Sequence, residues 1–121
     1  MLLKFIINGR LPGYNELKGR SWQASYRLKE QAKRDVQIYA MRGKVRPIKG
    51  KAMVKIAYYE PNARRDPDNV QSGANKIILD ALQDLGVLQG DGRKYVTLIS
   101  LPVEVDKNNP RIEVIIEEME D

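Results

Sequence analysis

The chain has 121 residues, of which 42% are hydrophobic, and it contains no cysteine and no histidine. This length fits a single domain, residues 1–121, and the missing side chains exclude disulfides, thiolate zinc sites and imidazole catalysis. The net charge of +5 is uneven, because residues 1–55 carry +11 and residues 56–121 carry −6. This distribution indicates either a polyanion-binding surface beside a cation site or simply a solvated basic helix and acidic tail.

The first predicted element is a strand at residues 2–8, because the apolar start is too short for a signal peptide and has no small-residue cleavage site. Residues 11–22 contain Pro, two Gly and Asn, and we expect a loop. Apolar residues at helical spacing predict a helix over 25–41, and a strand follows at 52–59. The apolar positions of this helix are Leu28, Ala32, Val36, Tyr39 and Ala40.

The second half begins with a polar loop at 60–65, followed by the clearest helix, at 67–85. Strands are expected at 95–101 and 111–117, with a turn at 107–110. The order β-α-β-α-β-β predicts an α+β domain, with a mixed β-sheet and two main helices packed on it. The apolar stripe of the second helix comprises Val70, Ala74, Ile77, Ile78, Ala81, Leu82 and Leu85.

No apolar run approaches the roughly 20 residues that a membrane-spanning helix needs. We therefore expect no membrane partner and a cytoplasmic location.

The segment Asp66-Pro67-Asp68-Asn69 has two interpretations. Asp is a favoured N-cap and Pro a favoured first helical residue, so the segment could simply start a helix, with Asp68 placed well for the helix dipole. Alternatively, two carboxylates one residue apart can converge on one hard cation. Taken alone, the segment favours the helix start.

Two further residues favour the cation site. Asp91 lies between two glycines just beyond the helix, where no capping role accounts for a carboxylate. Lys76 follows Asp68 by two helical turns on the face opposite the apolar stripe, where it can point at a substrate. The alternative for Lys76 is an ordinary surface lysine paired with Asp80 at i+4.

Carboxylates and a lysine without histidine suit phosphodiester hydrolysis assisted by Mg²⁺, with Mn²⁺ as a possible substitute. The lysine could neutralise charge that develops on the departing oxygen. Basic residues near the site and on the first helix could hold DNA phosphates, which gives salt-dependent affinity without sequence information. These are Arg64, Arg65, Arg27, Lys33 and Arg34.

In the same order, the chain shows Leu-Pro-Gly-Tyr-Asn at 11–15, a basic helix, Arg-Arg-Asp-Pro-Asp-Asn at 64–69, a helical lysine and a Gly-Asp loop. This order resembles the RusA family of Holliday-junction resolvases over most of the chain. One departure is Ser72, which stands where the family pattern has its lysine, one turn before Lys76. The resemblance implies that Asp66, Asp68 and Asp91 are metal ligands, that Lys76 is catalytic, and that Asn15 and Asn69 lie near the substrate.

The resemblance further implies a homodimer that cuts four-way DNA junctions by paired nicks in recombination and repair. Two alternatives remain open. The chain could be a non-catalytic junction-binding module, since Ser72 replaces the expected lysine, or a small structural domain in which Asp66 only begins a helix.

Overall fold

The computed structural model describes residues 2–119. Their backbone forms four strands and three helices, because apolar residues alternate along each strand and recur every three or four positions along the two long helices. In chain order these are β1 (Leu2–Asn8), α1 (Tyr14–Lys18), α2 (Trp22–Arg42), β2 (Ala52–Glu60), α3 (Pro67–Asp84), β3 (Val96–Val105) and β4 (Arg111–Glu118).

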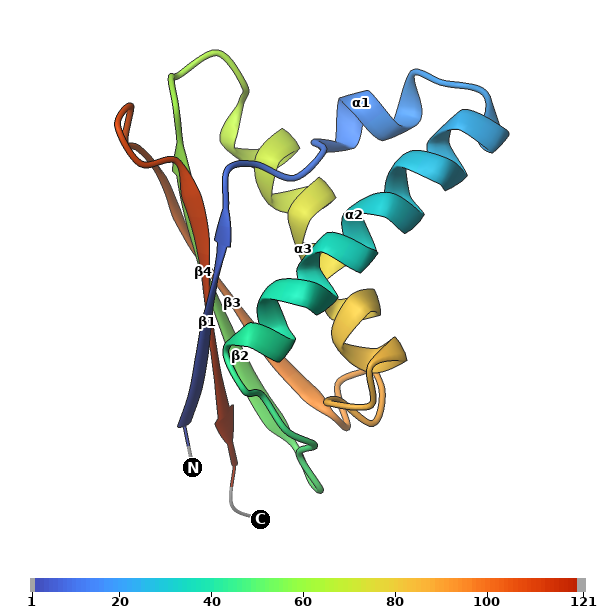
Figure 1. The fold of residues 1–121 in the computed structure, drawn as a ribbon, viewed down its shortest axis with the longest axis vertical. Coiled ribbons are helices and arrows are strands. Elements are labelled where there is room, and N and C mark those ends of the chain that lie inside the picture. Colours follow the sequence, from blue (N-terminus) through green and yellow to red (C-terminus); the bar gives the residue numbers. More distant parts are fainter. Residues whose placement is uncertain (1, 120–121) are drawn as a thin grey trace.

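The strands form one mixed sheet in the order β1-β4-β2-β3. β4 lies between β1 and β2 and is antiparallel to both, whereas β2 and β3 are parallel. A parallel pair needs a crossover connection, and α3 provides it. All three helices lie against one face of the sheet, and the other face has no helix on it (Figure 1). The predicted α+β class and single mixed sheet are confirmed.

The core lies between the sheet and the two long helices. On β2 every second side chain is buried, from Ala52 through Tyr58 to Glu60, and these residues face the helices. The stripe predicted on α3 is buried from Val70 to Leu82. A fully buried Ile or Leu side chain contributes about 1.5–3 kcal/mol, so this stripe orients α3 and leaves its opposite face to solvent.

Polar contacts fix α3 along its length. The hydroxyl of the buried Tyr58 on β2 hydrogen-bonds the side chains of Asn75 on α3 and Ser100 on β3. Gln37 on α2 donates to the carbonyl oxygen of Ala81 at 3.2 Å. The neighbours of Asn75 on α3 are therefore held in place relative to the sheet.

The predicted loop at 11–22 is wrong in its middle part, because residues 14–18 form α1. The Glu16 side chain accepts from the Gly13 backbone N–H at 3.1 Å, which stabilises the start of this short helix. α2 also begins at Trp22 rather than 25, since the Ser21 hydroxyl accepts from the Ala24 N–H at 3.2 Å.

The other boundaries differ by a few residues. α3 ends at Asp84, and Gly86 has a φ of +84°, the left-handed conformation that commonly follows a helix. β3 runs four residues beyond its predicted end, to Val105, because a register shift opposite Ile56–Tyr58 lets it continue along β2.

Candidate functional site

The start of α3 carries two exposed carboxylates. Asp66 occupies the N-cap position with extended backbone angles of φ −65° and ψ 145°, and Pro67 is the first helical residue. The Asp66 side chain nevertheless makes no capping hydrogen bond. Within residues 2–119 neither Asp66 nor Asp68 has a side-chain hydrogen bond or ion pair. Capping therefore does not occupy the Asp66 carboxylate, although its sequence position favours a cap.

Lys76 and Asp91 lie side by side. The Lys76 ammonium is 3.7 Å from an Asp91 carboxylate oxygen and 3.3 Å from Asp80. The sequence left open whether Lys76 is an ordinary surface lysine paired with Asp80. In the structure Lys76 contacts both Asp80 and Asp91. Lys29 on α2 also reaches Asp80, at 3.1 Å. The Lys76 side chain remains 58% exposed, so its ammonium is open to a ligand from solvent.

The three predicted ligands do not form one group. Eight residues of α-helix separate Asp68 from Lys76, a rise of about 12 Å. Asp91 lies at the end of the Lys76 side chain, and Asp66 and Asp68 lie at the start of α3. Within residues 2–119 no three acidic side chains are grouped closely enough to hold a metal ion. The structure thus pairs Asp91 with the lysine rather than with the other two carboxylates.

The donor set at the start of α3 still fits a magnesium ion. Mg²⁺ is usually bound through one or two carboxylates, and water fills its remaining octahedral positions. Asp66 and Asp68 are both exposed and supply these two carboxylates. A third protein ligand is therefore not required.

The segment before α1 packs directly on α3. The Asn69 side-chain oxygen accepts from the Asn15 backbone N–H at 2.7 Å. One turn later, a Cβ on Gly73 would lie 2.7 Å from the Gly13 carbonyl carbon and closer still to the Pro12 oxygen. Asn15 is thus held beside the start of α3, whereas the Asn69 oxygen is engaged in this internal contact.

Arg65 has internal partners on all three guanidinium nitrogens. It donates to both oxygens of Glu60 at 2.8 and 2.9 Å, to the Leu11 carbonyl at 3.0 Å and to Glu16 at 2.8 Å. Its side chain is only 12% exposed. These contacts occupy the Arg65 guanidinium, which was predicted to bind DNA phosphates. Arg64, its neighbour, is exposed.

Glu60 is the one buried charged residue among those described. Burial raises the pKa of Glu60, but hydrogen bonds and the charge of Arg65, together with Arg10, outweigh it and hold that pKa below its ordinary value. The pairing of Glu60 with Arg65 could have been predicted from the sequence. Glu60 continues the buried alternation of β2, and a buried carboxylate requires a cationic partner.

A groove of about 330 Å³ lies between α1, α2 and α3. The prediction included only Lys76 among its cations and missed two others. Lys18 lies in the segment predicted to be a loop, and Lys29 lies on the basic face predicted for the first helix. The groove is lined by Lys18, Lys29 and Lys76, by Ser25 and Ser72, and by Tyr14, Leu17 and Ile77.

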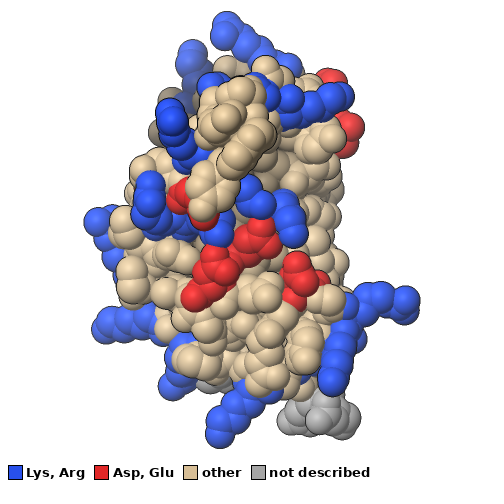
Figure 2. Space-filling model, turned by 90° about the vertical axis from the view of Figure 1, so that its right-hand side faces the viewer, with Lys and Arg blue, Asp and Glu red and all other residues tan. Residues whose placement is uncertain are grey.

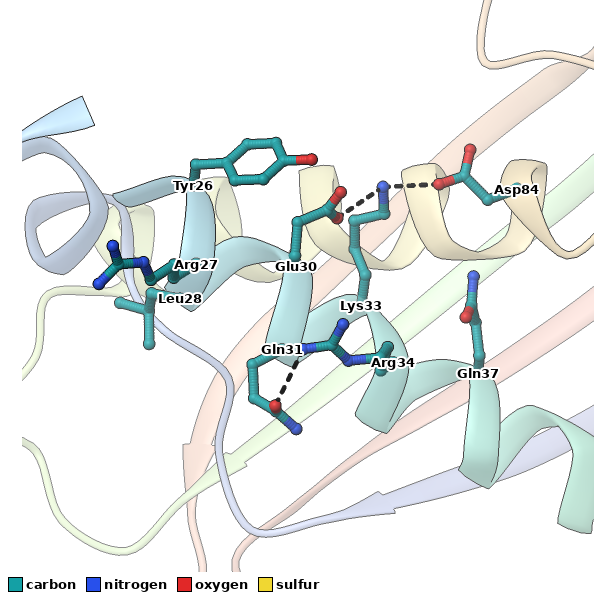
Figure 3. A pocket seen from close by; sticks show the side chains of 9 residues that line it. All are labelled: Tyr26, Arg27, Leu28, Glu30, Gln31, Lys33, Arg34, Gln37 and Asp84. Atoms are coloured by element: carbon teal, nitrogen blue, oxygen red, sulfur yellow. Dashed lines mark hydrogen bonds and ion pairs between the residues drawn. The ribbon is translucent and has the colours of Figure 1, made fainter. Parts of the chain in front are cut away.

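The basic residues of α2 that were predicted to bind DNA differ in how far they are exposed and paired. Lys33 lies between Asp84 at 2.6 Å and Glu30 at 3.0 Å in a wide surface groove (Figure 3). Hydrogen bonds to Asp84 and then to Glu30 raise the pKa of Lys33 to about 12. Lys33 therefore joins α2 to α3, whereas Arg27 and Arg34 stay exposed.

Basic and acidic side chains lie close together on the surface that the helices form. Lys and Arg side chains are spread over the helical side of the molecule, and a smaller group of acidic side chains lies among them (Figure 2). A surface of this kind attracts a polyanion and leaves local carboxylates beside it.

Comparisons with protein-family models and with curated proteins find no match for this chain. Among the helices of residues 2–119, none has the length and apolar character to cross a bilayer.

Proposed function

We propose that the protein is a magnesium-dependent endonuclease that cuts branched DNA, with the four-way junction as its substrate. The observation that supports this most is that, within residues 2–119, Asp66 and Asp68 have no side-chain partner at the start of α3, the helix that also presents Lys76 beside Asp91. The order of motifs that resembles the RusA family supports the junction as substrate.

In this proposal Asp66 and Asp68 hold the ion, which when bound supplies Lewis-acid polarisation of the scissile phosphodiester. The Lys76 ammonium neutralises negative charge that develops on the departing oxygen. Asp91, at 3.7 Å, positions that ammonium. The resemblance also implies that Asp91 is a third metal ligand, and in the fold its carboxylate lies beside the Lys76 ammonium.

The substrate strand is held through its phosphates. Lys18 lines the groove that also contains Lys76, and Arg27 lies exposed on α2. Lys29 lines the same groove and is paired with Asp80. Contacts of this type give affinity that falls steeply with salt and carries little sequence information.

A second candidate is a junction-binding module without catalysis. The observation that favours it is the absence, within residues 2–119, of any group of three acidic side chains that could hold a metal. Junction binding that persists in EDTA, with no nicking under Mg²⁺ or Mn²⁺, would select this candidate.

The deciding test compares the native chain with Asp66→Asn on a synthetic four-way junction and on linear duplex, with and without Mg²⁺. We expect native protein to nick the junction and Asp66→Asn to lose at least about a hundredfold in rate, because even residues that only support metal ligands contribute 10–100-fold. Mg²⁺ should also raise the Tm of native protein but not of the variant, since a ligand stabilises the state that binds it.

Asp35→Asn is the matched control, because Asp35 is an exposed carboxylate on α2 whose contact is a hydrogen bond from Gln31 at 3.1 Å. It should cut at the native rate. Equal cutting of junction and linear duplex would keep the nuclease but overturn the junction substrate. Full activity of Asp66→Asn would overturn the metal site.

We further propose that the active form is a homodimer, because two strands of a junction are cut at opposed positions. The face of the sheet without helices supports this, since it carries the exposed apolar side chains Leu2 and Ile6 on β1. A two-fold contact between such faces would bring the same residues together twice.

A further inference from the structure

Three aromatic side chains are exposed where α1 meets α2. Trp22 is 73% exposed, Tyr26 is 56% exposed and Tyr14 is 50% exposed. Trp22 and Tyr26 lie one helical turn apart, with ring centroids 6.2 Å apart and planes at 75°. Tryptophan is highly buried on average in folded proteins, so an exposed pair of this kind indicates a surface that binds something.

The charges around this pair identify the partner. Residues 14–29 contain four cations and one acid, Glu16, whose carboxylate is already paired with Arg65 at 2.8 Å. At the upper end of the face in Figure 2, where α1 and the start of α2 lie, Lys and Arg side chains lie around uncharged atoms, and acidic side chains lie at the right-hand edge. Lys29 pairs with Asp80 on α3, but cations still outnumber acids around the rings. Flat rings beside an excess of cations fit nucleotides whose bases are free to stack and whose phosphates lie near the cations.

The backbone that presents the rings is fixed. The Ser21 hydroxyl caps α2, and the Ser25 hydroxyl donates to the Leu17 carbonyl at 2.7 Å, which ties α2 to α1. Rings on a rigid scaffold lose little conformational entropy when a base stacks on them. The adjoining groove, with Tyr14, Lys18 and Lys29, offers a path for the attached phosphates toward Lys76.

We propose that Trp22 and Tyr26 form a stacking surface for unpaired DNA bases, such as those opened at the branch point of a junction. The proposal rests on DNA as the partner in the proposed function, but it requires neither metal nor cleavage. It adds to that function a means of distinguishing branched DNA from linear duplex, in which the bases are stacked on each other.

Trp22 is the only tryptophan of the chain, so its fluorescence reports directly on its own surroundings. The test is titration in EDTA with an oligothymidine of about 16 nucleotides, a length within the known range for stacking proteins, and with linear duplex of equal length. We expect the oligothymidine to quench Trp22 strongly and the duplex to quench it weakly at equal occupancy.

Variants are compared by anisotropy of a labelled oligothymidine. Tyr26→Ala and Trp22→Ala should each weaken binding about tenfold, within the usual range for loss of one stacked base, and Trp22→Phe should recover most of the loss. Met41→Ala is the matched control, because Met41 is 57% exposed at the other end of the same helix, and it should bind as native. Circular dichroism checks that each variant is folded.

Three results would overturn the proposal. The first is equal quenching by single strand and duplex, and the second is unchanged binding by Trp22→Ala. The third is an emission already shifted to the blue that varies with protein concentration, which would place Trp22 between two copies of the chain. Since all measurements are made without metal, loss of the nuclease proposal would leave this one standing, and the reverse also holds.

Discussion

Gly73 sets the distance between α3 and the segment that precedes α1. Its position leaves no space for a Cβ, because the nearest atoms are backbone atoms of Pro12 and Gly13. This contact holds Asn15 beside Asn69 at the start of α3. The absence of a side chain at Gly73 therefore allows the segment with Asn15 to lie beside the start of α3, where Asp66 and Asp68 are exposed.

Gly73→Ala should lower the free energy of unfolding by about 1–3 kcal/mol, the usual effect of overpacking. Helix propensity alone would act in the opposite direction, by about 1 kcal/mol in favour of Ala, so a net loss identifies the packing contact. Urea denaturation of native and variant protein measures this.

Gly50→Ala is the control, since a Cβ there meets nothing within 4 Å, and it should change stability little. A stabilised Gly73→Ala would mean that the segment before α1 does not pack on α3 as described.

For individual residues, the sequence predicts the position in the fold better than the contacts of the side chain. The sequence places Asp66 at a helix start, and the structure agrees, yet the carboxylate is free of the capping role that its position favours. The sequence predicts that Arg65, like Arg64, holds DNA phosphates. Its true partners, Glu60 and Glu16, are 5 and 49 residues away in the chain, and no local pattern reveals the second of these.

Among the elements, the pair formed by Glu60 and Arg65 joins the end of β2 to the segment before α3 and, through Glu16, to α1. Because the pKa of Glu60 is lowered in the fold, the pair stabilises the protein above the ordinary value of 4.5. This stabilisation is lost as the pH falls through the folded pKa.

Glu60→Gln should therefore reduce stability by about 1–3 kcal/mol at neutral pH, because Arg65 loses its charged partner on β2 and keeps Glu16 as its one carboxylate. The difference between native protein and the variant should shrink well below pH 4.5, where native Glu60 also becomes neutral. Urea denaturation at both pH values tests this. A difference that stays constant with pH would contradict the role assigned to the carboxylate.

Long, strongly periodic elements were predicted well. The stripe of α3 and the alternation of β2 determine which faces are buried, so their existence and orientation follow from the sequence. α1 was missed because five residues are too few to show a helical period, and its Gly13 start resembles a turn. Its stability comes from the Glu16 contact and from packing on α3.

At the scale of the whole molecule, the sheet is covered on one face only (Figure 1). On the uncovered face of β1, Leu2 is 63% exposed and Ile6 is 41% exposed. Apolar side chains in this setting favour association between copies. The sequence predicts the layers of the fold. It does not predict that β4 lies between β1 and β2, because that order depends on pairing between strands that are far apart in the chain.

Ile6→Lys should shift the proposed dimer toward monomer, because each copy would place a charge in the apolar contact. Light scattering after size exclusion measures the mass, and Lys107→Glu, an exposed change in the turn after β3, should leave it unchanged. A native protein that is monomeric at all concentrations would contradict the dimer.

The position of β4 has a consequence for synthesis. β1 leaves the ribosome before its neighbour in the sheet, β4, and the two pair from Leu2 with Glu117 to Asn8 with Arg111. Nearly the whole chain must therefore be made before β1 can pair, and closing so long a loop carries a large entropic barrier. Until then, the backbone groups of β1 that pair with β4 stay unpaired and can pair with other chains.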